Sequence, residues 1–402
     1  MGDAGVLTQA AVAVRGATVA AVGSQVLLER EFASADRVDC SGCVITPGLV
    51  DSHTHSVFGR ARYEEQEMRA AGVGYLEIAS RGGGIHSSVR DLRSRDEDEL
   101  FALAVSRVAR LASYGSTTIE VKSGYGLTVA DEIKSLRVVA RLAHALPVRI
   151  ISTWLGAHEI PLEFRDTARS REEYVSVVVE EMLPEVVRLE LAQFADVFCE
   201  PGVFTVKETR RILSAAKASG LGLRLHADEL EASGGAELAA ELGAASADHL
   251  VAISDIGIEA IARSETVATL LPGTMLFLGR ARQAPARRLI DAGAAVALAT
   301  DFNPGTSPTV NLPLILTLGV SSLRMTTAEV IVAATVNAAA ALGLAGTTGQ
   351  LSQGFDADVA IFEVDDYREI PYWYGDRRCT GTWARGKACH PWAPPDNLHA
   401  SR

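Results

Sequence analysis

Short apolar runs alternate with longer amphipathic stretches through the middle of the chain. In stretches 97–111 and 129–144, apolar residues recur three and four positions apart, which is the period of a helix. The apolar runs between such stretches are rich in Val, Ile and Leu without strict alternation, a pattern typical of parallel strands buried on both faces. The eight runs are 44–50, 117–121, 148–155, 195–199, 221–225, 245–249, 266–271 and 295–300.

Eight strand–helix units predict an α/β protein built on a (β/α)8 TIM-like barrel, whose active site lies at the carboxyl ends of its strands. A doubly wound open sheet is the alternative that gives the same alternation.

Both ends of the chain are β-rich instead. Short strand-like runs occur at 11–14, 17–22, 357–364 and 380–385. The simplest arrangement is a small β-sandwich domain formed from residues 1–46 and 348–402, with the barrel, residues 47–347, inserted between them.

Ligand-type residues close most of the predicted barrel strands. The first run leads directly into Asp51-Ser-His-Thr-His55, so two imidazoles two residues apart lie where a strand ends. Five of the nine histidines lie at such ends. The full set is His53, His55, Lys122, His158, Glu200, His226, His249 and Asp301. Because these ends meet at one mouth of a barrel, the pattern predicts a metal site there.

Three or four nitrogen and oxygen ligands that leave a coordination position for water are the arrangement of a hydrolytic metal ion. Such a site also needs a group that moves protons. Glu229, three residues after His226, would lie just past the strand end and face the bound water. His249 and Asp301 are also placed to take part.

The composition and net charge of the chain limit the kinds of molecule that it is expected to bind. A net charge of -12 and a pI near 5.3 argue against nucleic acid or an anionic membrane as partner, although one buried arginine could still bind an anionic small substrate. No window reaches the roughly 18 apolar residues that span a bilayer. Five cysteines in 402 residues do not make a disulfide framework, so we expect a cytoplasmic protein with reduced thiols.

The strand-end pattern resembles the amidohydrolase superfamily, in which a His-x-His follows the first strand, histidines end strands five and six, and an aspartate ends strand eight. Within it, the chain is similar to the imidazolonepropionase family. The segments that carry this resemblance begin at Asp51-Ser-His-Thr-His-Ser-Val-Phe-Gly-Arg-Ala-Arg62. They continue with Ala79-Ser-Arg-Gly-Gly-Gly-Ile85, Glu120-Val-Lys-Ser-Gly-Tyr-Gly126, Gly156-Ala-His-Glu159, His226-Ala-Asp-Glu229, Ser246-Ala-Asp-His249, Leu270-Leu-Pro-Gly273 and Ala299-Thr-Asp-Phe-Asn-Pro-Gly-Thr-Ser-Pro308.

The resemblance implies the site residue by residue. Superfamily members with two metals carry a lysine at the end of strand four, where this chain has Glu200. The resemblance therefore implies one Zn²⁺ or Fe ion per subunit, held by His53, His55, His226 and Asp301. It implies substrate contacts from Arg62, Tyr75, Tyr125, His158, Glu229, Asn303, Gly305 and Thr306. Departures are confined to His86, Ser87 and Arg60, none of which belongs to the ligand set.

The reaction implied is hydrolytic opening of the small molecule 4-imidazolone-5-propanoate to N-formimidoyl-L-glutamate, in histidine degradation. His249 would stabilise the oxyanion, and either Glu229 or Asp301 would move the proton to the leaving nitrogen. Two alternatives stay open: a mononuclear metal-dependent deaminase of a nucleobase-like heterocycle, and a metal-binding sensor without catalysis. We also expect a homodimer.

Overall fold

The computed structural model describes residues 4–73, 77–78, 82–165 and 170–390 of the chain. Eight parallel strands form one sheet in the order β11-β10-β9-β8-β7-β6-β5-β4, so every strand lies beside its neighbour in sequence. The strands are β4 (Leu49–Asp51), β5 (Ser116–Lys122), β6 (Arg149–Ala157), β7 (Phe194–Cys199), β8 (Gly222–Ala227), β9 (Ser246–His249), β10 (Val267–Leu270) and β11 (Val296–Leu298). The predicted barrel is confirmed, and the open-sheet alternative is wrong.

The first and last strands meet just beyond their carboxyl ends. A parallel bridge joins Thr54 to Phe302, and the amide of His55 donates to Phe302 O at 2.8 Å. The amide of Asp301 donates to His53 O at 3.0 Å. The segments that close the barrel are therefore the same segments that carry three of the predicted ligands.

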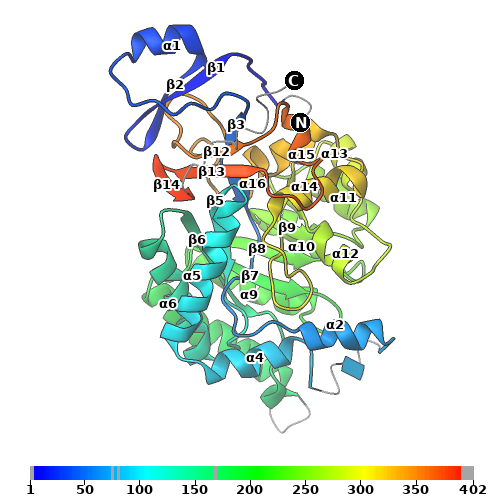
Figure 1. Cartoon of the computed structure of the whole chain (residues 1–402). Helices are drawn as coiled ribbons and strands as arrows, with labels where there is room; N and C mark the ends of the chain where they lie inside the picture. The colour runs from blue at the N-terminus through cyan, green and yellow to red at the C-terminus, as the bar shows by residue number, and fades with distance from the viewer. Residues whose placement is uncertain (1–3, 74–76, 79–81, 166–169, 391–402) are drawn as a thin grey trace.

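Helices cover the outside of the barrel (Figure 1). The described helices of this part are α2 (Tyr63–Ala70), α4 (Ile85–Ser94), α5 (Glu97–Ser113), α6 (Val129–Ala145), α7 (Arg171–Ser176), α8 (Leu183–Arg188), α9 (Val206–Ala218), α10 (Gly235–Leu242), α11 (Asp255–Ala262), α12 (Pro272–Phe277), α13 (Ala286–Asp291), α14 (Leu312–Ser321), α15 (Thr327–Ala333) and α16 (Val336–Ala341). Of these, α5, α7, α9 and α15 begin with a reciprocal Ser/Thr/Asp–Glu capping box, which satisfies two free amides at the helix start. A π-helical segment, Val177–Met182, joins α7 to α8, and 3₁₀ turns occur at Leu162–Phe164 and Tyr367–Glu369. Both predicted amphipathic stretches, 97–111 and 129–144, lie in helices, α5 and α6.

Segments from both ends of the chain build the antiparallel part of the fold. One sheet has the order β14-β13-β12-β3, formed by β3 (Val44–Pro47), β12 (Val359–Phe362), β13 (Cys379–Ala384) and β14 (Lys387–His390). The other is the hairpin of β1 (Ala10–Arg15) and β2 (Thr18–Ser24). A bridge from Thr18 to Asp356 ties this hairpin to the chain just before β12. The exact domain boundaries, residues 46/47 and 347/348, remain a prediction.

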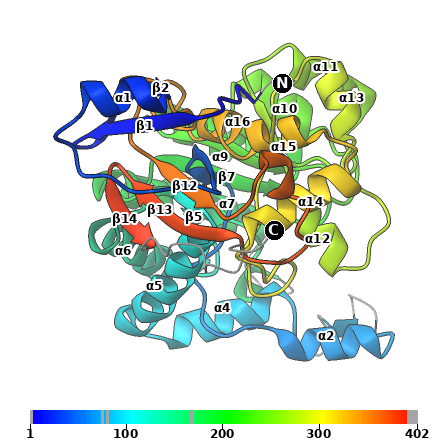
Figure 2. The same cartoon turned by 45° about the horizontal axis from the view of Figure 1, so that its top comes forward.

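The antiparallel sheets lie at the end of the barrel opposite the active-site mouth. In Figure 1 the hairpin lies at the top and α2, which follows the end of β4, lies at the bottom; Figure 2 shows the same separation. The small sheet also contacts the barrel's outer helices, because Thr382 Oγ1 donates to Ala112 O of α5 at 3.2 Å.

Two local predictions need correction. The N-terminal region, which was predicted to be β-rich, also contains a helix, α1 (Gln25–Glu31). The run 44–50 is two strands, since β3 pairs with β12 in the small sheet whereas β4 pairs with β5 in the barrel. The chain changes sheets at Gly48. Among the residues that the structure describes, no helix is both long and apolar enough to cross a membrane.

Gly48 must lack a side chain, because a Cβ there would lie 2.0 Å from Thr117 Oγ1 on β5. We therefore expect Gly48→Ala to destabilise the protein by about 1–3 kcal/mol, the usual cost of overpacking a buried position. This would lower the apparent melting temperature. Gly23→Ala in β2 is the matched control, since a Cβ there meets nothing within 4 Å. Equal melting temperatures for the Gly48 variant and the wild-type protein would contradict this account of the crossover.

Candidate metal centre and active site

Five histidines and one aspartate converge inside the mouth of the barrel. His53 and His55 follow β4, His226 lies on β8, His249 ends β9, and Asp301 follows β11. Three overlapping groups have ligand atoms within 4.8 Å of one another: His53, His226 and His249; His55, His158 and His226; and His53, His55 and Asp301. The structure thus brings together all four predicted ligands, with His158 and His249 beside them.

Asp301 lies between the two histidines of the first strand end. Its Oδ1 is 3.6 Å from His53 Nε2 and 3.5 Å from His55 Nε2. The ring of His226 lies 4.6 Å from that of His53, measured between centroids. All four side chains are almost fully buried.

Two buried carboxylates hold the histidine rings from below. His53 Nδ1 lies 2.7 Å from Asp248 Oδ2, which leaves its Nε2 facing the cluster. His226 Nδ1 lies 3.0 Å from Asp196 Oδ2. Carboxylates in this position fix the orientation and tautomer of a metal-ligating imidazole.

The sequence analysis missed Asp196 and Asp248. A usable signal was present for Asp196, because it is a carboxylate inside the otherwise apolar strand Phe194–Cys199, where an unpaired charge would be very costly. Asp248 lies between Ala247 and His249 in a polar strand and gave no such signal. Two residues predicted at strand ends lie outside these three histidine-containing groups. Lys122 lies on β5 and bonds to Glu120 and Asp196, and Glu200 accepts hydrogen bonds from backbone amides of the loop after β8.

The donor atoms suit a metal ion. His53 Nε2, His55 Nδ1 and His226 Nε2 are buried ring nitrogens without a hydrogen-bond partner among the described residues. Burial, reinforced by neighbouring positive groups, holds the pKa values of His53 and His55 well below the ordinary histidine value. Both rings are therefore neutral at physiological pH, which is the form that binds a metal.

The backbone is strained where two of these residues lie. His249 has φ of 75° and Asp301 has φ of 50°, in the left-handed region that L-residues rarely adopt. Strain of this kind persists where the surrounding structure imposes it, and it clusters at functional sites. Here it turns the side chains inward at the strand ends.

Two carboxyl groups near the cluster have raised pKa values. Burial raises the pKa of Glu229 to about 8, helped by the negative charges of Asp301 and Glu200, and its Oε1 lies 3.7 Å from His249 Nδ1. Burial raises the pKa of Asp301 to about 6, and Thr274 donates a hydrogen bond to it at 2.6 Å. Carboxyl groups that titrate near neutrality are suited to moving protons.

Arg62 packs flat against the backbone of Gly305. A Cβ at Gly305 would lie 1.4 Å from Arg62 Nη2, so only glycine fits there. Arg62 is mostly buried, with Nε 3.4 Å from Glu65 Oε1 and its amide bonded to Pro304 O.

Asn303 organises the loop that carries Gly305. Its Oδ1 accepts from the amides of Gly305 at 2.9 Å and Thr306 at 2.7 Å. Beside the histidine cluster, the ring of Tyr125 lies 5.9 Å from that of His55 and 5.4 Å from that of His158. Tyr75 lies outside the described residues.

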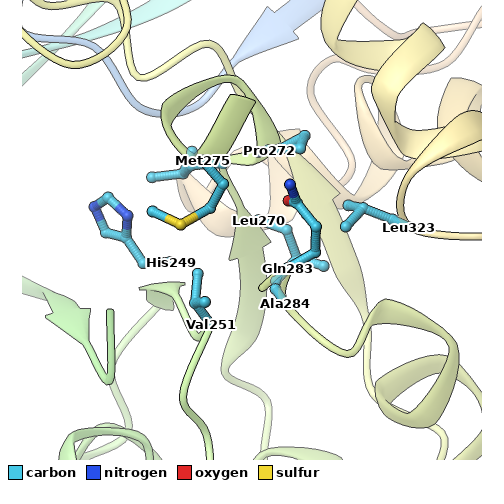
Figure 3. A pocket seen from close by; sticks show the side chains of 9 residues that line it. His249, Val251, Leu270, Pro272, Met275, Gln283, Ala284 and Leu323 are labelled. Carbon is cyan, nitrogen blue, oxygen red and sulfur yellow. The ribbon is translucent and has the colours of Figure 1, made fainter. Parts of the chain in front are cut away.

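A narrow pocket adjoins His249 (Figure 3). Val251, Leu270, Met275 and Leu323 contribute to its lining. Mainly apolar side chains therefore flank His249 on this side.

Comparison with known proteins agrees with the barrel and its histidine cluster. Residues 60–390 match the family described as the amidohydrolase family. The chain belongs to this family of hydrolases.

Its relatives identify the group more narrowly. The chain is 48% identical over 379 residues to the imidazolonepropionase of Geobacillus kaustophilus, covering 93% of this chain and 88% of that protein. It is 50% identical over 341 residues to the imidazolonepropionase of Brevibacillus brevis, covering 85% and 80%. Within the amidohydrolase family, the chain belongs with the imidazolonepropionases.

Solved structures with the same fold are more distant. A 5-methylcytosine deaminase from Klebsiella pneumoniae liganded with phosphonocytosine has a TM-score of 0.72 at 16% identity, covering 94% of this chain and 93% of that one. An adenosine deaminase from Xanthomonas campestris with bound zinc has a TM-score of 0.70 at 18% identity, covering 97% and 91%. These similarities support the fold alone.

The burial of His158 predicts a pH dependence of stability in metal-free protein. Burial lowers the pKa of His158 to about 3, so the unfolded chain takes up a proton near pH 6.5 that the folded chain does not. Stability from this group is therefore lost as pH falls below about 6.5, by up to about 1.4 kcal/mol per pH unit. Relative to the wild-type protein, His158→Gln should gain stability as pH falls from 6 to 4, measured by urea unfolding after chelation. If the difference in unfolding free energy between His158→Gln and the wild-type protein does not change with pH, this prediction is wrong.

Proposed function

We propose that this chain catalyses the hydrolytic ring opening of 4-imidazolone-5-propanoate to N-formimidoyl-L-glutamate. The observation that carries this proposal is a cluster of buried histidines, whose ring nitrogens include several without a hydrogen-bond partner among the described residues, lying beside the buried carboxyl group of Glu229. Close relatives named imidazolonepropionase support the choice of reaction.

One metal ion would be held by His53, His55, His226 and Asp301. These nitrogen and oxygen donors suit zinc and iron(II) alike, and a barrel of the same fold is described with bound zinc. When bound, such an ion lowers the pKa of a coordinated water toward neutrality and polarises a carbonyl.

Proton movement would fall to Glu229, His249 and Asp301. With a pKa of about 8, Glu229 can both accept and return a proton near neutral pH. His249 is adjacent, and its buried ring can donate a hydrogen bond to an oxyanion that develops on the ring carbonyl. Glu229 and Asp301 both remain candidates for delivering the proton to the leaving ring nitrogen.

Arg62 would bind the propanoate arm of the substrate. A guanidinium group matches a carboxylate in two parallel hydrogen bonds. The other contacts would come from the rings of Tyr125 and His158, which can flank a flat heterocycle, and from Tyr75, Glu229, Asn303, Gly305 and Thr306.

Product analysis distinguishes this reaction from the deaminase alternative, which the relatives do not favour. Metal-loaded protein should convert freshly prepared imidazolone propanoate to formimidoyl-glutamate without releasing ammonia, and should not act on guanine or cytosine. Ammonia release from either nucleobase, with no ring opening of imidazolone propanoate, would favour the deaminase. Tight binding of imidazolone propanoate without any turnover would favour the sensor.

The proposed role of Arg62 in binding the substrate carboxylate can be tested by substitution, with the nearby Arg60 as the control. We expect Arg62→Ala to raise KM at least about 10-fold, because it removes a charge-assisted pair of about 1.5–3 kcal/mol. Gly305→Ala should act in the same direction by displacing the guanidinium group. Arg60→Ala is the control, since that side chain is 59% exposed and pairs with Glu64. A normal KM in Arg62→Ala would remove the carboxylate anchor from the proposal.

The homodimer and the cytoplasmic location expected from the sequence remain predictions.

A further inference from the structure

A layer of charged side chains lies directly beneath the histidine cluster. Lys122 Nζ is 2.7 Å from Glu120 Oε1, 2.7 Å from Asp196 Oδ2 and 3.9 Å from Asp248 Oδ2. All four side chains are fully buried. Their strands, β5, β7 and β9, alternate around the barrel, as do the strands that contribute to one interior layer of such a fold. In this protein the layer is ionic, where branched apolar residues usually predominate.

A second buried cation, Arg224, contacts Asp248 and Glu120 of this layer. Arg224 Nη2 is 3.0 Å from Asp248 Oδ2 and Arg224 Nε is 3.6 Å from Glu120 Oε1. Its guanidinium group also donates to Ser52 O and Ala341 O, each at 2.7 Å. Among the described lysines and arginines, Lys122 is the one that pairs with Asp196.

Each carboxylate in the layer holds part of the predicted metal site. Asp248 contacts His53 Nδ1 at 2.7 Å, and Asp196 contacts His226 Nδ1 at 3.0 Å. Glu120 accepts the amide of Thr54, the residue between His53 and His55, at 3.1 Å. The ammonium group of Lys122 therefore lies within 4 Å of the three carboxylates that contact His53, His226 and the backbone between His53 and His55.

We propose that Lys122 is a positioning residue for the metal site, which sets the ring of His226 by fixing the carboxylate of Asp196 in place. It does the same for His53 through Asp248, a task that it shares with Arg224. This inference rests on the proposed metal ligands. It differs from a purely structural role for Lys122, because it requires the folded protein to lose metal affinity when the ammonium group is removed.

Removal of Lys122 should affect His226 and His53 to different extents. Without Lys122, Asp248 keeps its contact with Arg224, whereas Asp196 keeps no cationic lysine or arginine partner among the described residues. The remaining contacts of Asp196 are then with His226 itself, through its backbone amide at 3.2 Å and its ring Nδ1 at 3.0 Å. A buried carboxylate that has lost its counter-charge shifts toward other donors or draws in water. The ring of His226 should therefore be displaced more than that of His53.

The test is the zinc affinity of the folded protein, measured by competition with a chromogenic chelator after metal removal. Lys122→Met keeps an unbranched side chain, one heavy atom shorter, and removes its charge. We expect its dissociation constant for Zn²⁺ to rise about 10- to 100-fold, the usual effect of losing an outer-shell partner. Lys134→Met is the control and should bind Zn²⁺ as the wild-type protein does. Lys134 lies on α6 and donates to Leu92 O and Arg95 O.

A double-mutant cycle shows whether Lys122 acts through Asp196. If it does, Lys122→Met should weaken Zn²⁺ binding much less in an Asp196→Asn background than in the wild-type protein. The double variant also loses one charge of each sign, which protects the fold. If Lys122→Met alone does not fold, comparison of Asp196→Asn with the double variant still decides the question, because this inference expects similar affinities for the two.

The outcomes separate the two proposals. Failure of the wild-type protein to bind Zn²⁺ or iron would contradict the proposed function itself. Tight binding by the wild-type protein together with unchanged affinity in Lys122→Met would overturn only the positioning role. A lower melting temperature of metal-free Lys122→Met with unchanged Zn²⁺ affinity would show that Lys122 serves the fold alone.

Discussion

Closure of the barrel at the ends of β4 and β11 is the constraint on which the site depends. The amide of Asp301 bonds to His53 O, and the amide of His55 bonds to Phe302 O. Thr300 adds two hydrogen bonds to the buried carboxyl group of Asp51. The bonds that join the first strand to the last therefore also fix the spacing of His53, His55 and Asp301. Fold and ligand geometry cannot be changed independently here.

Burial of the charged layer beneath the histidines has a free-energy cost, and its contacts with the histidines explain why charged residues occupy this position. Burying three carboxylates with two cations is unfavourable compared with apolar packing unless every member is well paired. Here Lys122 and Arg224 pair with the carboxylates, and the carboxylates in turn contact the imidazoles of His53 and His226. Ionic side chains thus replace apolar packing in this part of the barrel interior, and they orient the proposed ligands. The antiparallel sheets lie at the opposite end of the barrel, away from the site (Figure 1).

The sequence predicted the barrel because parallel strands buried on both faces leave continuous apolar runs, and it located the ligands because each one ends such a run. It could not reveal the change of sheet at Gly48, since one apolar run continues through both strands and only the side chain of Thr117 shows why glycine is needed. The roles of Asp196 and Asp248 depend on which strands alternate within a barrel layer. That information is three-dimensional, although for Asp196 a carboxylate within an apolar strand was a visible sign.

The central claim is that this histidine cluster binds a metal ion without which the chain cannot open its substrate. The most direct measurement is the turnover of imidazolone propanoate, followed by its ultraviolet absorbance, with chelated and metal-restored protein side by side. We predict loss of absorbance only after Zn²⁺ or iron is restored, with formimidoyl-glutamate as the product. Equal turnover by the chelated, metal-free protein, or none by folded and fully metallated protein, would contradict the account.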